Sequence, residues 1–124
     1  MAGINVVESN RVLESLLRGT AFGTAPTTPL KLGLHTGDPG AAGTSNEVTG
    51  GTYVRQAITF VAAAGGATAM TGSVDTPGMP ACTVTHASLF DTGGLFLFSA
   101  ALAVPIVCAA GDTVRMTAWP LTLA

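Results

Sequence analysis

The side chains of this sequence that could do chemistry are two histidines, a few acids and isolated serines. His35 and Asp38 lie three positions apart in a glycine-rich segment, while His86, Ser88 and Asp91 contain the residue types of a hydrolytic triad. Ser88 and His86 are two apart on a predicted strand, so they share a face but lack the sharp turn that exposes a nucleophilic serine. We therefore expect hydrogen-bonding structural roles for these residues.

Metal, glycosidase and phosphate chemistry have equally little support. A metal site needs three or four ligands, and neither histidine has a third ligand at a recognisable spacing. Asp38 and Glu47 are the one pair of acids in a loop, and a solvated turn explains them better than a pair of catalytic carboxylates. The glycine-rich segments are not followed by Lys-Ser/Thr or by a helix. We predict no catalytic residue, no cofactor and no metal ion, and hence no enzyme.

The two cysteines, Cys82 and Cys108, have no neighbouring histidine or cysteine at metal-ligand spacing. They are predicted to be reduced, buried thiols that pack like small apolar side chains, with a disulfide as the alternative. We expect no signal peptide, because Glu8, Asn10 and Arg11 interrupt the N-terminal apolar residues. Assembly in the cytoplasm favours the reduced thiols.

The composition predicts one domain, residues 1–124, whose surface is covered by other subunits. The chain has 20 Ala, 16 Gly and 18 Thr but only 10% charged residues, far below the usual quarter. Five basic against seven acidic residues exclude a nucleic-acid-binding surface. The most apolar stretch, 95–110, is too short and interrupted to span a membrane. We expect a homo-oligomer, with a trimer as the candidate form, that binds neither nucleic acid nor membrane.

One helix is predicted, over about residues 5–18. Asn5 can cap its start and Gly19 can supply the left-handed residue after its end. Glu14 and Arg18 are spaced to form an ion pair along it. Its apolar face needs a partner, so the residues of that face are candidate interface residues: Val6, Leu13, Leu16 and Leu17.

From about residue 30 onward the sequence predicts short strands separated by turns. Alternating apolar residues and evenly spaced turn residues are typical of a mainly β domain, an antiparallel β-sandwich or jelly-roll-like fold. An Ala/Gly-rich segment, 62–72, has little bulk to set its register. The expected strands are 30–34, 53–60, 84–90, 95–98 and 114–119, with a continuation at 121–123 and a long surface loop at 35–51.

Four further residues are candidates for an interface. Arg55 and Arg115 lie in the middle of predicted strands, where an arginine either extends to solvent or forms an ion pair with a partner. Tyr53 and Trp119 either lie at the rim of the core or anchor a subunit contact.

Several segments, in the same order, resemble a known protein family. They are 16–22 (LLRGTAF), 32–40 (LGLHTGDPG), 46–60 (NEVTGGTYVRQAITF), 84–91 (VTHASLFD) and 110–113 (AGDT). The chain resembles small virion proteins of tailed phages, often labelled tail-fibre proteins, some of which look like capsid decoration proteins. The match spans roughly residues 13–120, and its most specific part is 47–60.

The resemblance implies a structural protein of the virion, assembled in the host cytoplasm, whose partners are the major capsid or a tail protein. It supplies no catalytic residue. Because 124 residues without coiled-coil heptads do not suit a long fibre, we expect a capsid decoration (cement) protein held by repeated contacts. The alternatives are a tail-fibre or tail-tip component, and a glycan-binding module, which would need a cluster of exposed aromatic rings.

Overall fold

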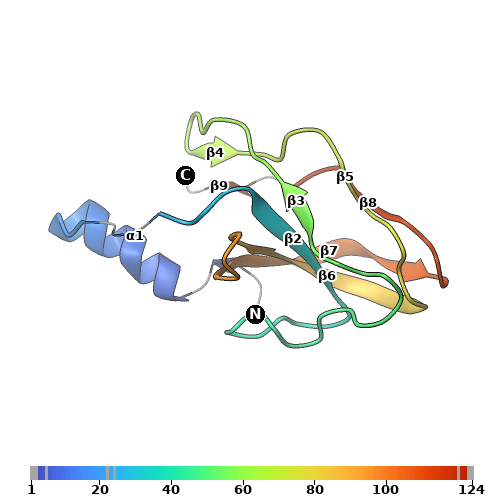
Figure 1. The fold of residues 1–124 in the computed structure, drawn as a ribbon. Coiled ribbons are helices and arrows are strands. Elements are labelled where there is room, and N and C mark those ends of the chain that lie inside the picture. Colours follow the sequence, from blue (N-terminus) through green and yellow to red (C-terminus); the bar gives the residue numbers. More distant parts are fainter. Residues whose placement is uncertain (1–2, 5, 22, 24, 120, 123–124) are drawn as a thin grey trace.

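The computed structural model describes residues 3–4, 6–21, 23, 25–119 and 121–122. The chain is mainly β, with antiparallel strands and one N-terminal helix, α1 (Val6–Arg18), as predicted (Figure 1). Its sandwich or jelly-roll form stays a prediction. None of the helices among the described residues is long and apolar enough to cross a membrane. The strands are β1 (Gly3–Ile4), β2 (Leu30–His35), β3 (Gln56–Ile58), β4 (Ala67–Thr68), β5 (Val74–Thr76), β6 (Cys82–Phe90), β7 (Phe96–Cys108), β8 (Val114–Met116) and β9 (Leu121–Thr122).

The main sheet has the order β1-β7-β6-β2-β3, and two small ribbons, β4–β9 and β5–β8, accompany it. β6 and β7 form a hairpin around a turn in which Asp91 accepts the Leu95 N–H at 2.8 Å. β2 lies between β6 and β3, so that Leu32 is opposite both Leu89 and Gln56. The predicted strands at 30–34 and 84–90 are therefore confirmed.

Both faces of the β2–β6 pair are covered, one by an apolar core and the other by the chain segment between β2 and β3. Leu32 and Leu34 project into an apolar core that the β5–β8 ribbon closes with Val74, Val114 and Met116. Because successive residues of a strand point to opposite faces, Gly33 and His35 lie on the other face. Parts of the segment 36–55 cover that face, since the Ser45 carbonyl contacts His35 and the Glu47 carboxylate lies beside Gly33, so the sequence between β2 and β3 is a structural layer as well as a loop.

The segment 36–55 packs closely despite its glycines. Pro39 is fully buried, and Gly43 lies directly against the ring of Phe96, where an added Cβ would overlap the ring carbons. Gly43 also has a φ of +75°, which side-chain-bearing residues rarely adopt. The expected surface loop is thus correct in position, but part of it is buried.

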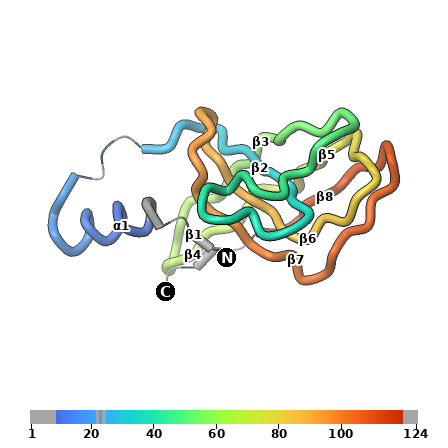
Figure 2. The backbone as a smooth tube through the Cα atoms, turned by 90° about the horizontal axis from the view of Figure 1, so that it is seen from below, coloured from blue at the N-terminus to red at the C-terminus, as the bar shows by residue number. Residues whose placement is uncertain are grey.

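Helix α1 lies to one side of the β-structured body, as both backbone views show (Figures 1 and 2). Its end matches the prediction: Gly19 has a φ of +70°, and Arg18 Nε is 3.2 Å from Glu14 Oε2. Val12 and Ser15 are half-buried, whereas the leucines point outward. The predicted cap, Asn5, lies outside the described residues.

Several strand limits differ from the sequence prediction. Residues 53–55 are not in a strand, because the Tyr53 hydroxyl accepts the Leu34 N–H at 2.9 Å where a neighbouring strand would offer a carbonyl. β7 continues to Cys108, since a register shift between Val84 and His86 lets it follow β6 beyond the expected end. β8 is shorter than predicted, and β1 and β5 were not expected.

Because Gly43 lies against the Phe96 ring, adding one methyl group at position 43 should destabilise the folded protein. Gly43→Ala should lower the free energy of unfolding more than Gly72→Ala does, by about 1–3 kcal/mol, measured by urea denaturation. Gly72 is the matched control, because its φ is +63° but no atom lies within 4 Å of an added Cβ. Equal losses in the two variants would show that only backbone strain is involved.

Candidate functional site

Five side chains form a polar cluster beside the β2–β6 pair: His35, Glu47, Tyr53, Arg55 and Ser88. His35 comes from β2, Ser88 from β6, and the other three from the segment that covers them. His35 and Ser88 are both 0% exposed. The cluster thus joins the sheet to its covering layer through buried polar groups.

The His35–Ser88 pair fixes the orientation of the imidazole. His35 Nδ1 lies 2.9 Å from the Ser45 carbonyl oxygen, which can only accept, so Nδ1 carries the proton. In the neutral ring, Nε2 then accepts from the Ser88 hydroxyl at 2.7 Å. Burial lowers the pKa of His35, and it outweighs the opposing effects of the Ser45 hydrogen bond and of Glu47. His35 is a neutral link between β2, β6 and the segment above them.

Glu47 is held by three donors. Arg55 donates from Nε and from one terminal nitrogen to the two Glu47 oxygens, both at 2.8 Å, and the Tyr53 hydroxyl donates to Oε2 at 2.8 Å. Burial disfavours the charged carboxylate, but the hydrogen bonds from Arg55 and Tyr53 outweigh it and hold the pKa of Glu47 below its usual value. Burial raises the pKa of Tyr53. Arg55 also lies over the Phe90 ring, 3.6 Å from its centre.

Gly33 leaves the space that the cluster occupies. A Cβ at this position would lie 2.5 Å from Ser88 Oγ and 3.3 Å from Glu47 Oε2. Any other residue would push apart the serine and the carboxylate, so the glycine between two leucines of β2 is explained by this close approach.

A serine next to a histidine is also the start of a nucleophile–base arrangement, but this pair is sealed from solvent. His35 Nδ1 donates to a backbone carbonyl and not to an acid, so the orienting carboxylate of a triad is missing from this contact. The triad residue types do not meet: His86 contacts Thr85, and Asp91 accepts N–H groups from Leu95 and Thr27.

The prediction that Asp38 and Glu47 are both acids of a solvated turn is correct for Asp38 and wrong for Glu47. Asp38 lies in an exposed turn, where it accepts the Gly40 N–H at 2.8 Å, as expected of a solvated turn residue. Glu47 is instead an internal ion-pair partner, because the turn at Gly50 and Gly51 brings Arg55 back to it. The sequence signal for this pair is the opposite charge of Glu47 and Arg55, eight positions apart on either side of a Gly-Gly turn, and the sequence prediction did not use it.

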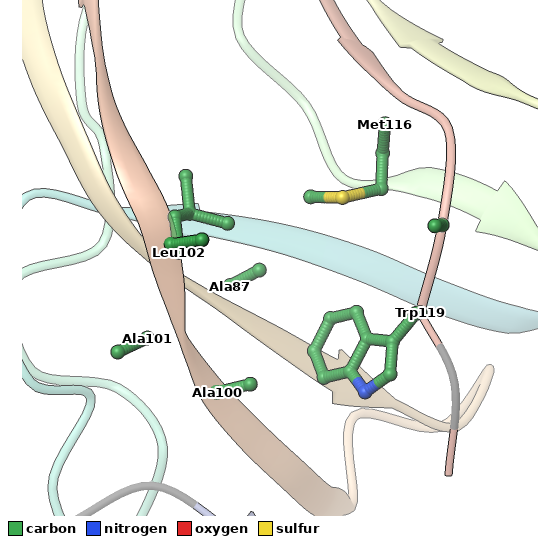
Figure 3. Close-up of a pocket in the computed structure, with 8 residues that line it drawn as sticks. Ala87, Ala100, Ala101, Leu102, Met116 and Trp119 are labelled. Atoms are coloured by element: carbon green, nitrogen blue, oxygen red, sulfur yellow. The ribbon is translucent and has the colours of Figure 1, made fainter.

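The interface candidates of the β-structured body lie in different places. Tyr53 and Arg55 belong to the polar cluster. Arg115 on β8 pairs with Asp75 on β5, at 2.7 and 3.1 Å, on the exposed surface. Trp119 is buried and borders a hollow of about 200 Å³, where it and Met116 lie across from Ala100 and other residues of β6 and β7 (Figure 3).

The side chains that line this hollow are alanines, Leu102, Met116 and Trp119, and its one aromatic ring is mostly buried. The other candidate ring, Tyr53, is half-buried with its hydroxyl engaged. Neither provides the exposed aromatic surface that sugar binding requires. Among the described residues, no group of three or more His, Cys, Asp or Glu side chains is placed to hold a metal ion.

Among the described residues, most of the exposed large apolar side chains lie on α1 and on β7. Leu13, Leu16 and Leu17 are 53%, 75% and 77% exposed, and Val104 and Val107 on β7 are 73% and 80% exposed. Val6 begins α1, but its side chain lies outside the described part of the chain. The leucines of the predicted apolar helix face are therefore exposed to solvent and not packed against the β-structured body.

These features define a class of protein: a small β-structured unit whose polar side chains stabilise its own layers and whose large apolar side chains remain on its surface. A family model described as "Podophage GP4 fiber I protein gp80" matches residues 3–124, and the chain belongs to this family. A search of curated proteins found no match. The chain is therefore a non-enzymatic structural protein of a phage virion, as the resemblance implied.

The family segments explain why the polar cluster matters. Each of its members lies in one of the segments that carry the resemblance: His35 in 32–40, Ser88 in 84–91, and the other three in 46–60. The segment 46–60 thus supplies both donors to Glu47 and, through the Tyr53 hydroxyl, a hydrogen-bond acceptor for the Leu34 N–H of β2.

The buried neutral His35 predicts a pH dependence of stability. Because the pKa of His35 is lowered from 6.5 in the folded protein, the unfolded chain takes up the proton first as pH falls. The stabilisation is fully present above pH 6.5 and is lost as pH falls through the folded pKa, with a slope of up to about 1.4 kcal/mol per pH unit. Urea denaturation of the wild type between pH 7.5 and 5 measures this slope.

Two variants test whether the dependence of stability on pH comes from His35. His35→Asn should unfold more easily at every pH but show a shallower dependence, while His86→Asn, which leaves His35 in place, should retain it. A slope unchanged in His35→Asn would contradict the assignment.

Proposed function

We propose that this chain is a structural component of the phage tail fibre, a single domain that is held in place by repeated apolar contacts with neighbouring virion proteins. The observation that carries the proposal is the match to a fiber-protein family over residues 3–124. It favours the fibre alternative of the sequence analysis over capsid decoration.

The leucine face of α1 supports a role in assembly. Leu13, Leu16 and Leu17 are each more than half exposed, and burying a leucine side chain is worth about 1.5–3 kcal/mol. An amphipathic helix whose apolar face points to solvent needs a partner surface. We assign this face, with Val6 as its predicted continuation, as the main docking surface.

The remaining interface candidates contribute in different ways. Tyr53 and Arg55 shape the covering segment through Glu47, and Trp119 supports the wall of the apolar hollow. Arg115 is on the surface, where its exposed pair with Asp75 contributes little to stability and can be rearranged at a contact. Many such contacts, each weak, add up when identical subunits repeat, which supports a homo-oligomer, with a trimer as the candidate form.

The position of the protein on the particle tests the proposal. A small peptide tag added to the chain, followed by immunogold electron microscopy of intact virions, should label the tail. Label spread over the capsid lattice would overturn the fibre assignment and restore the capsid decoration reading.

Polar substitutions on α1 test the docking surface. Leu16→Glu with Leu17→Glu should leave the free energy of unfolding nearly unchanged, because both side chains are exposed, but should reduce incorporation into virions at least tenfold. Incorporation is measured by immunoblotting purified particles. The matched control, Leu16→Met with Leu17→Met, keeps the apolar surface and should incorporate normally. Normal incorporation of the glutamate variant would exclude this face as a contact.

A further inference from the structure

The two cysteines face each other across the β6–β7 hairpin. Cys82 begins β6, Cys108 ends β7, and the two are directly opposite in the antiparallel register. Directly opposite residues share a face, with Cβ atoms about 4.5–5.5 Å apart and Cα atoms about 4.5–5.5 Å apart, within the Cα range of disulfides. Both thiols are free in this structure.

The two thiols differ in their access to solvent. Cys108 is 5% exposed and belongs to the apolar core, while Cys82 packs against that core and is half-buried. Burial raises the pKa of the Cys108 thiol, and the neighbouring Cys82 raises it further. A small reagent therefore meets Cys82 first, and Cys108 reacts faster with a group attached to its neighbour than with a reagent from solution.

The pair also lies beside an irregular part of the hairpin. Beyond a register shift, only three residue pairs join the far end of β6 to β7: those of Cys82, Thr83 and Val84. The segment of β7 opposite the shift contains Pro105, which has no N–H to donate. A covalent link between the outermost pair would fix this short ladder.

We propose that Cys82 and Cys108 are an oxidation site that forms a cross-strand disulfide when the virion leaves the reducing cytoplasm and meets small-molecule disulfides. The cytoplasm keeps such thiols reduced during assembly, whereas released particles are exposed to oxidising surroundings. The inference goes beyond the fibre assignment and does not depend on where in the virion the chain is placed.

The chemistry is two successive thiol–disulfide exchanges with, for example, oxidised glutathione. The Cys82 thiolate attacks one sulfur of the small disulfide, whose S–S bond breaks and releases one glutathione thiolate. The Cys108 thiolate then attacks the Cys82 sulfur of the mixed disulfide and displaces the second glutathione thiolate. The two protein thiols are oxidised, one small disulfide is reduced to two thiols, and the two protons pass to the released thiolates.

The disulfide closes a ring that contains the whole β6–β7 hairpin. Such a link restricts the unfolded chain, and more so for a long closed segment than for a short one. The oxidised protein is therefore expected to melt at a temperature about 10 °C higher than the reduced protein.

The test uses the full chain, reduced and then incubated in native buffer with oxidised glutathione. Remaining thiols are trapped with N-ethylmaleimide and counted by intact mass. The expected product is a chain that is not covalently linked to another, with no trapped thiol and a raised melting temperature, and dithiothreitol should reverse both changes. Cys108→Ser should stop at a glutathione adduct on Cys82, and Cys82→Ser should react at least tenfold more slowly, since its remaining thiol is buried.

The controls separate this site from nonspecific oxidation. The double variant Cys82→Val with Cys108→Val should show no change in melting temperature with oxidant, and the urea-unfolded wild type should form the disulfide, which proves that the oxidant is active. Two trapped thiols in the native protein after the unfolded chain has been oxidised would overturn the proposal. A product linked between two chains would overturn it as well.

Discussion

The structure depends on the requirement that buried polar groups have hydrogen-bond partners. His35 and Ser88 are on the face of the sheet that the segment 36–55 covers, and an unpaired polar group there would cost about 1–3 kcal/mol. The covering segment supplies the Ser45 carbonyl to His35, and its own acid, Glu47, is neutralised by Arg55. These partners fix the path of a glycine-rich segment that has little regular structure of its own.

The opposite face of the sheet follows a simpler rule. Leu32, Leu34 and Leu89 pack with side chains of the β5–β8 ribbon in a core that needs only shape and hydrophobicity. The sheet is therefore held on one side by packing, and on the other by directed bonds added to packing contacts such as that of Gly43 with Phe96. Directed bonds require set distances and angles between donor and acceptor, so they specify one arrangement of the covering segment.

The small number of charged residues in the chain fits this arrangement. Several of the few charged side chains are committed to pairs within the chain, as in Glu47–Arg55, Asp75–Arg115 and Glu14–Arg18. The surface that remains is rich in small and apolar side chains, with leucines on α1 and valines on β7. Such a surface suits a subunit of a larger structure, which agrees with membership of a virion protein family.

The sequence by itself determined the local elements: the extent of α1, the strands β2 and β6, the turn after Phe90 and the mainly β class. These follow from short-range periodicity and from residues such as Gly19 that suit one backbone conformation. The family resemblance also came from the sequence. Only the tertiary structure decided that Ser88 pairs with His35 and that Arg55 turns inward to Glu47. Such partners are brought together by the register of distant strands and by the course of the covering segment, and no local pattern records either.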